Sequence, residues 1–208
     1  MFYLTSFLVL QATIRKNGVT MSTVFSKLSV LVPTLISILA FGEQPTVWGV
    51  AGFALALAAI VLMNTGAEPG QIASRGLLLL MLLVGGLGDV MSKVYDQIGP
   101  AQWSSSFLAF TFAVALVLCG ILCVLRKERL TLREWLFGLL LGVPNYFSAY
   151  FLLRSLAQVP ATAAFPTFAV GVPAVVSLVG ILLFRERLTR RQWTAMGIIA
   201  VSLVLLNL

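Results

Sequence analysis

Residues 24–37 read VFSKLSVLVPTLIS, and a related stretch, AFPTFAVGVPAVVS, follows at residues 164–177. At an offset of 140 residues, Pro33 matches Pro173 and Ser37 matches Ser177. After a shift of three residues, FGEQPTVWGVAGFALALAAIVLMN (41–64) matches FRERLTRRQWTAMGIIAVSLVLLN (184–207), with Phe, Glu, Thr and Asn in coincident positions. An apolar composition alone does not align Pro, Glu, Thr and Asn in one order. These matches therefore indicate an internal repeat.

The composition places the chain in a membrane. It has 60% hydrophobic and 10% charged residues and a mean hydropathy of +1.02, whereas soluble domains carry about 25% charged residues. The net charge of +7 comes from short basic clusters between apolar runs, which is typical of loops that face anionic lipid rather than nucleic acid. Histidine is absent and Cys119 and Cys123 lie one turn apart in an apolar run. We therefore expect no disulfide framework, metal site, cofactor or enzymatic activity.

The apolar runs predict an all-α integral membrane protein with about eight transmembrane helices. Most of them reach the about 20 residues that cross a bilayer, and no stretch alternates with a period of two. The predicted helices lie near residues 1–14, 19–41, 46–64, 76–94, 103–125, 135–153, 159–184 and 192–208.

The repeat predicts two units, at residues 1–65 and 72–208. The second unit contains five predicted helices, and an odd number of spans inverts one copy relative to the other, as in many secondary transporters. Met1 falls opposite Leu141, so about 70 residues of the second unit have no counterpart in the first. We therefore expect either a fragment of a ten-helix protein or missing helices supplied from elsewhere, for example by a homodimer.

Basic residues segregate between alternate connections. One side is predicted to receive Arg15, Lys16, Arg75, Arg126, Lys127, Arg129, Arg133 and the four arginines of RERLTRR, and the other side only Lys93 and Arg154. The positive-inside rule makes the first side cytoplasmic and sends the C-terminus outside, in an inner or plasma membrane.

The last two predicted helices, SLAQVPATAAFPTFAVGVPAVVSLVG and LLFRERLTRRQWTAMGIIAVSLVLLN, resemble those of EamA-like permeases of the drug/metabolite transporter superfamily. The mid-helix Pro173 and the ERLT turn carry the resemblance. It implies ten helices in two inverted repeats around a central cavity, and export or exchange of small metabolites by alternating access. Members of this family commonly keep both termini in the cytoplasm, which conflicts with the orientation that the basic residues indicate.

Lys27 is the first candidate binding residue. A lysine at this depth costs about 2.5–10 kcal/mol unless it pairs, reaches the headgroups or faces a watery cavity. Two interpretations stay open: a cation in the cavity that binds an anionic or carbonyl-bearing solute, and a side chain that reaches back to the headgroups beside Lys16.

Asp89 is the only acidic residue inside an apolar run, which makes it the candidate for a proton-coupling carboxylate. The alternative, which the spacing favours, is an ion pair with Lys93 at i, i+4. Glu43 and Glu186 fall in predicted turns, where we expect them to cap the helices that follow.

The stretch GVPNYFSAYFLLR (142–154) is the most polar one at membrane depth. It predicts a helix that lines the cavity with Asn145, Tyr146, Ser148 and Tyr150, or alternatively one whose polar groups bond to neighbouring helices. Phe165 is a further candidate for the cavity wall. Pro33 and Pro173, at matching positions, are candidate hinges or gates.

The sequence thus predicts a multi-pass permease that moves a small solute by alternating access, in contact with membrane lipid and without nucleic acid. A truncated, non-transporting scaffold or subunit that needs a partner is the alternative. Substrate, coupling ion and direction of transport have no signal in the sequence.

Overall fold

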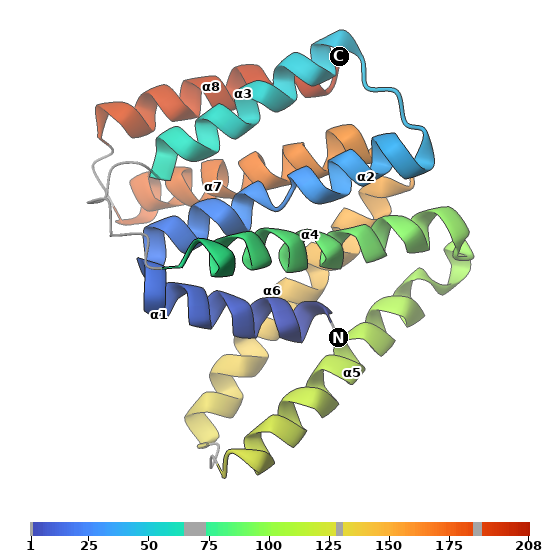
Figure 1. The fold of residues 1–208 in the computed structure, drawn as a ribbon, viewed down its shortest axis with the longest axis vertical. Helices are drawn as coiled ribbons and strands as arrows, with labels where there is room; N and C mark the ends of the chain where they lie inside the picture. Colours follow the sequence, from blue (N-terminus) through green and yellow to red (C-terminus); the bar gives the residue numbers. More distant parts are fainter. Residues whose placement is uncertain (1, 65–73, 128–130, 185–188) are drawn as a thin grey trace.

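The computed structural model describes residues 2–64, 74–127, 131–184 and 189–208, and none of these residues lies in a β-strand. Figure 1 shows the helices, whose bounds are α1 Phe2–Leu28, α2 Leu31–Phe41, α3 Val47–Asn64, α4 Arg75–Ile98, the short 3-10 helix Ala101–Trp103, α5 Ser104–Leu125, α6 Leu132–Leu156, α7 Ala161–Phe184 and α8 Arg190–Leu206. Five described segments are long and apolar enough to cross a membrane: Met21–Phe41, Arg75–Ile98, Ser104–Leu125, Leu132–Leu156 and Ala161–Leu182. The predicted class, an all-α membrane protein, is confirmed.

The first 41 residues fold into two antiparallel arms with one interruption. The chain reverses inside α1 at Gly18, whose φ of 76° lies in the left-handed region that glycine tolerates. The second arm stops at Leu28 and resumes at Leu31. This interruption lies just before Pro33, whose ring cannot donate a backbone hydrogen bond to Ser29. The carbonyl of Ser29 instead accepts from the amide of Val32 at 3.0 Å.

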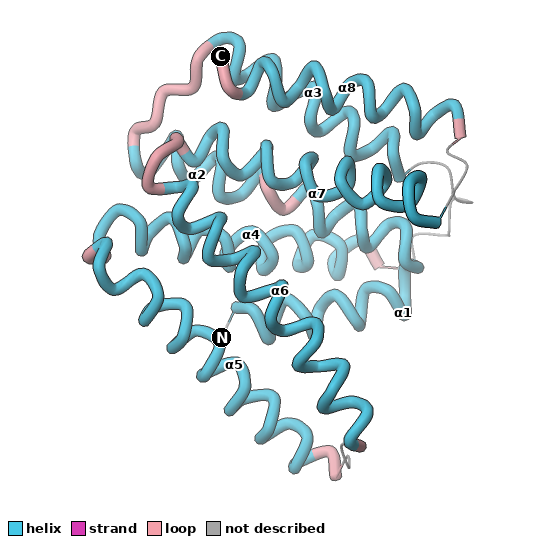
Figure 2. The backbone as a smooth tube through the Cα atoms, turned by 180° about the vertical axis from the view of Figure 1, so that it is seen from behind, coloured by secondary structure: helices cyan, strands magenta, loops and turns pink. Residues whose placement is uncertain are grey.

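Helices α3 and α8 pack side by side and run in opposite directions (Figures 1 and 2). The start of α3 meets the end of α8, where the hydroxyl of Ser202 donates to the carbonyl of Gly52 at 2.8 Å. A Cβ on Gly52 would lie 2.9 Å from the backbone nitrogen of Leu206. Three pairs of buried positions on the two helices are related by the repeat offset of 143 residues: Gly52 and Ala195, Ala56 and Ile199, Ala59 and Ser202.

Helices α2 and α7, which also match in the repeat, pack against each other and are likewise antiparallel. Val30, just before α2, and its counterpart Val170 in α7 belong to the same buried cluster. Helix α7 continues through Pro166 and Pro173, so the matching prolines differ: only Pro33 adjoins a helix break.

Helix α4 packs across α1 and α2. It approaches them closely at Gly86, where a Cβ would lie 2.6 Å from the carbonyl oxygen of Ser29 and would overlap Val32. The glycine therefore allows α4 to lie directly on the interruption between α1 and α2.

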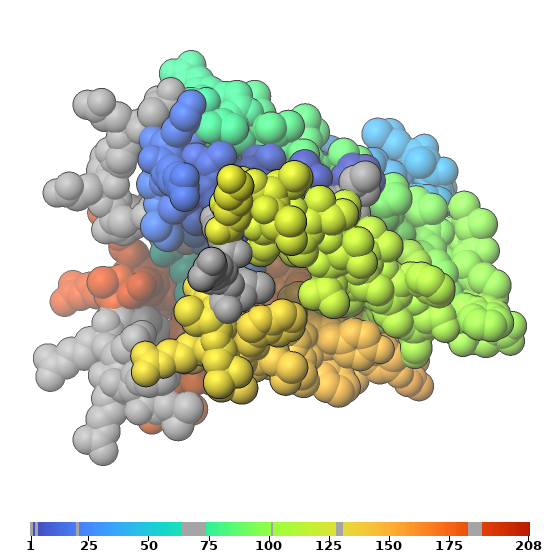
Figure 3. Space-filling model, turned by 90° about the horizontal axis from the view of Figure 1, so that it is seen from below, coloured from blue at the N-terminus to red at the C-terminus, as the bar shows by residue number. Residues whose placement is uncertain are grey.

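The α5–α6 hairpin projects from the bundle (Figure 1). Seen from below in Figure 3, the two helices run alongside each other with a hollow between them. All described residues from 131 to 145 are exposed, so the first half of α6 contributes little to the core.

The two ends of the bundle differ in charge. Arg75, Arg133 and Arg190 lie at the starts of α4, α6 and α8, and Arg126 ends α5. The start of α4 lies beside the turn in α1, where the Asn17 amide next to Gly18 exchanges hydrogen bonds with the backbone of Ser74 at 2.8 and 3.2 Å. The opposite end carries Lys93 and Arg154, as the sequence predicted, while the Arg residues at 129, 185 and 187 lie outside the described part.

Candidate functional site

Lys27 in α1 and Asp89 in α4 lie on two helices that pack against each other, and their opposite charges interact over a distance longer than that of a direct ion pair. Both side chains are half-buried and both lie inside segments that can span the membrane. Lys27 is the last residue but one of α1, directly before the helix interruption. Asp89 lies one turn beyond Gly86, which explains how two charges from separate helices come near each other.

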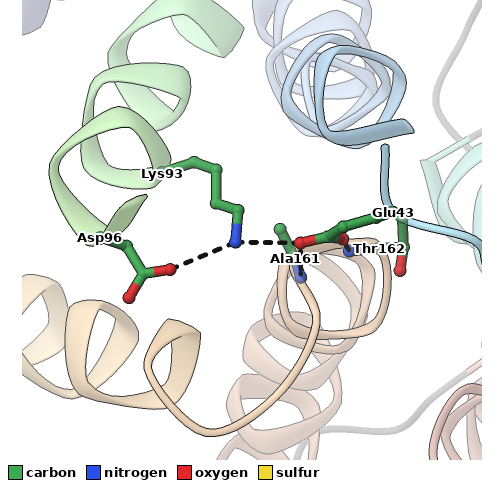
Figure 4. A network of polar contacts seen from close by, with 5 residues as sticks. All are labelled: Glu43, Lys93, Asp96, Ala161 and Thr162. Atoms are coloured by element: carbon green, nitrogen blue, oxygen red, sulfur yellow. Dashed lines mark hydrogen bonds and ion pairs between the residues drawn. The ribbon is translucent and has the colours of Figure 1, made fainter. Parts of the chain in front are cut away.

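A second charged cluster joins three helices at the end of the bundle opposite the basic one (Figure 4). The Lys93 ammonium in α4 contacts Oε1 of Glu43 at 2.9 Å and Oδ2 of Asp96 at 3.2 Å. Only 4% of the Lys93 side chain and 15% of the Glu43 side chain are exposed, so the pair is largely removed from solvent.

The Glu43 carboxylate also caps α7. Its Oε1 accepts from the amide of Ala161 at 3.1 Å, and its Oε2 from the amide of Thr162 at 3.0 Å. These are the first two amides of α7, which have no acceptor within their own helix. Glu43 thereby ties the turn between α2 and α3 to both α7 and α4.

Two expectations about these charges are wrong. Glu43 does not cap the helix that follows it. The hydroxyl of Thr46, directly before α3, accepts from the Gly49 amide at 2.9 Å, and the Glu43 carboxylate instead accepts from amides of α7. Lys93 forms its ion pairs with Glu43 and Asp96 rather than with Asp89 at i, i+4. Glu186, the repeat partner of Glu43, lies outside the described residues.

Burial raises the pKa of Glu43, but its hydrogen bonds outweigh burial. The ammonium of Lys93 and the amides of Thr162 and Ala161 all favour the ionised carboxylate and hold the pKa of Glu43 below its usual range. The carboxylate is therefore charged at neutral pH.

A polar pocket of about 760 Å³ lies beside this cluster, between the end of α4, the start of α5 and the end of α6. Lys93 and Asp96 belong to its wall, together with Tyr150 and Arg154 of α6. The guanidinium of Arg154 donates to the Tyr150 hydroxyl at 2.9 Å.

The other residues that were predicted to line one cavity lie in different parts of the structure. Tyr146 lies against Phe112 with ring centroids 5.8 Å apart and lines an apolar groove of about 470 Å³ between α5 and α6. Asn145 is exposed and Ser148 is half-buried on α6. Phe165 is 2% exposed in the hydrophobic core, so the structure places it in packing rather than on a wall of these two cavities.

Sequence reasoning singled out Lys27 and Asp89 but did not pair them, and it missed the cluster of Glu43, Lys93 and Asp96. The residues themselves were visible as rare charges next to apolar runs. Their partners depend on how separate helices are rotated and packed, which a single sequence does not specify.

The fold and these charged sites define the class of the protein as a multi-pass α-helical membrane protein with ionisable groups between its helices. The model of the EamA-like transporter family matches residues 74–208, and the chain belongs to this family. Its members are transporters rather than enzymes. An uncharacterized protein of Haemophilus influenzae is 28% identical over 200 residues, which cover 93% of this chain and 67% of that protein.

Proposed function

We propose that this protein moves a small solute across the membrane by alternating access, with a binding site at Lys27 and Asp89. The observation that carries the proposal is the attraction between these two charges beside an interrupted helix at membrane depth. Interrupted helices expose unpaired backbone groups, and transporters use such points to bind solutes and ions. Membership of a transporter family supports the same interpretation.

The proposal treats residues 1–65 and 72–208 as two inverted copies. Two pairs of matching helices, α2 with α7 and α3 with α8, pack against each other in opposite directions. Alternating access by rocking of one copy against the other needs such a relation between the halves. Pro33, next to the interruption, is the hinge candidate, and Pro173 is its counterpart in a continuous helix.

Counterflow of a panel of small metabolites into proteoliposomes tests the proposal, with Lys27→Met as the test variant. We expect the variant to lose saturable counterflow or to raise the apparent KM at least about tenfold, because one charge-assisted hydrogen bond contributes about 1.5–3 kcal/mol. Lys16→Met is the matched control, since this lysine of the same helix is exposed.

The same assay at two pH values tests Asp89 as the coupling carboxylate. Asp89→Asn is expected to remove the pH dependence of counterflow, because the amide cannot exchange a proton. Equal counterflow in the wild type, Lys27→Met and Lys16→Met contradicts the proposed site. Absence of saturable counterflow in the wild type contradicts transport itself and favours a non-transporting subunit.

A further inference from the structure

We propose that Glu43 is a gating residue: its carboxylate closes the end of the bundle away from the basic residues, and it must leave α7 and Lys93 for this end to open. The proposal rests on the alternating-access function proposed above. It adds a closing contact at one end of the bundle, separate from Lys27 and Asp89.

The contacts of Glu43 have the form that a closing contact needs. One side chain of the first repeat holds two helices of the second, α7 through the amides of Ala161 and Thr162 and α4 through Lys93 (Figure 4). Asp96 contacts the same ammonium from within α4 and stays with Lys93 if Glu43 leaves. The lysine therefore keeps a counter-charge when the helices separate, which lowers the cost of opening.

The closed end covers two buried hydroxyl groups. Ser37 lies six residues before Glu43 in the chain, and Thr167 lies six residues after Ala161 in the antiparallel α7. At 1.5 Å per residue, Ser37 lies roughly 6 Å from the end of α2 at Phe41, and Thr167 lies roughly 9 Å from the start of α7. Neither hydroxyl has a hydrogen-bond partner, although both are buried.

A buried hydroxyl without a hydrogen-bond partner at a helix contact destabilises the fold, unless a polar molecule can bind to it. Ser37 and Thr167 belong to α2 and α7, the two helices whose ends Glu43 joins. Release of Glu43 allows these ends to part and opens a route to both hydroxyls. The polar pocket beside Lys93 and Asp96 lies next to that route.

Cysteine labelling tests the gate without knowledge of the solute. In a full-length background with Cys119→Ser and Cys123→Ser, Ser37→Cys places a thiol at a fully buried position behind Glu43. The probe is a water-soluble maleimide added to both faces of the membrane. Ser22→Cys is the matched reporter at the basic end, because Ser22 is also fully buried and receives the same one-atom change.

We expect Glu43→Gln to raise the labelling rate of the Ser37→Cys thiol about tenfold or more, because the charge that holds the gate is lost. Labelling of the Ser22→Cys thiol is expected to stay unchanged or fall. Glu134→Gln is the matched control substitution: Glu134 caps its own helix α6 through Thr131, and it is exposed. This control is expected to change neither rate.

Unchanged labelling of the Ser37→Cys thiol in Glu43→Gln overturns the gate. An equal rise at both reporters also overturns it, since it shows general loosening of the fold. Counterflow is measured on the same variants to separate the two proposals. Saturable counterflow, with no change in Ser37→Cys labelling on Glu43→Gln, contradicts the gate alone. A rise in labelling that is confined to Ser37→Cys, without saturable counterflow, supports the gate and contradicts transport.

Discussion

Two charged residues of α4, Asp89 and Lys93, interact with charges from other parts of the chain and not with each other. Asp89 and Lys93 have the i, i+4 spacing that stabilises isolated helices by about 0.2–0.5 kcal/mol. In the folded chain Lys93 instead contacts Glu43 at 2.9 Å, and Asp89 interacts with Lys27. A charge in a low-dielectric interior gains more from a well-placed partner on another helix than from a solvated neighbour, so tertiary packing decides the pairing.

A double-mutant cycle on stability tests this pairing. We expect Lys27→Met and Asp89→Asn each to lower the unfolding temperature in detergent, because each leaves the other charge without its partner. The double variant is expected to lose less stability than the two single variants lose in sum, and the difference, the coupling free energy, is expected to be about 0.5–3 kcal/mol.

The control cycle combines Lys93→Met with Asp89→Asn and is expected to be additive within about 0.5 kcal/mol. Strong coupling in this control cycle, with none between Lys27 and Asp89, supports the i, i+4 pair and contradicts the structure.

At the scale of helices, small residues determine which elements approach closely. Gly52 admits the backbone of α8, and Gly86 admits the interruption between α1 and α2. The apolar runs predicted the helices well, since eight predicted segments overlap the two arms of α1, the continuation of the second arm into α2, and α3–α8. The interruption at Ser29 and Val30 was not predicted as a helix end, because a proline in a membrane helix is compatible with a simple kink.

Gly86→Ala tests the contact on which the charge pair depends. One added methyl group meets the Ser29 carbonyl and Val32, so we expect the change to destabilise the protein by about 1–3 kcal/mol and to reduce counterflow. Thermal unfolding and counterflow are measured on the same preparation.

Gly88→Ala is the matched control on α4. A Cβ there meets only the Phe2 side chain, at 3.9 Å, which is an ordinary van der Waals contact. Equal effects of the two substitutions would show that helix propensity, and not the approach of α4 to the interruption, determines the result.

At the scale of the whole molecule, the repeat and the composition together predicted much of the architecture. They predicted an all-helical membrane protein and assigned most of its basic residues to one side, with Lys93 and Arg154 on the other. The sites were predicted less well, because they depend on contacts between helices far apart in sequence. Phe165 illustrates the limit: an aromatic residue at membrane depth is equally compatible with a cavity wall and with the core, where it lies.

The pH dependence of the closed end follows from Glu43. The pKa of Glu43 is lowered in the closed form. The contact therefore stabilises the closed form fully at a pH above the usual pKa of glutamate, and this stabilisation is lost as the pH falls through the lowered pKa. We expect the ratio of Ser37→Cys to Ser22→Cys labelling to stay constant from neutral to mildly acidic pH and to rise only in stronger acid.

The ratio cancels the common effect of pH on thiol reactivity. The other charged groups at the contact are Lys93 and Asp96, both on α4. In Glu43→Gln the ratio is expected to be high and independent of pH. A rise near neutral pH in the wild type would assign the closing contact to a different titrating group.

The antiparallel contact between α3 and α8 has a mechanical consequence. Three buried positions of α3 match three buried positions of α8 at the repeat offset, so the two copies contribute equivalent surfaces to this contact. Such a contact does not need to slide or separate during a transport cycle, and it suits a pivot about which the remaining helices tilt. In the alternating-access cycle proposed above, the hydrogen bond from Ser202 to Gly52 would hold α3 and α8 together while the two ends of the bundle open in turn.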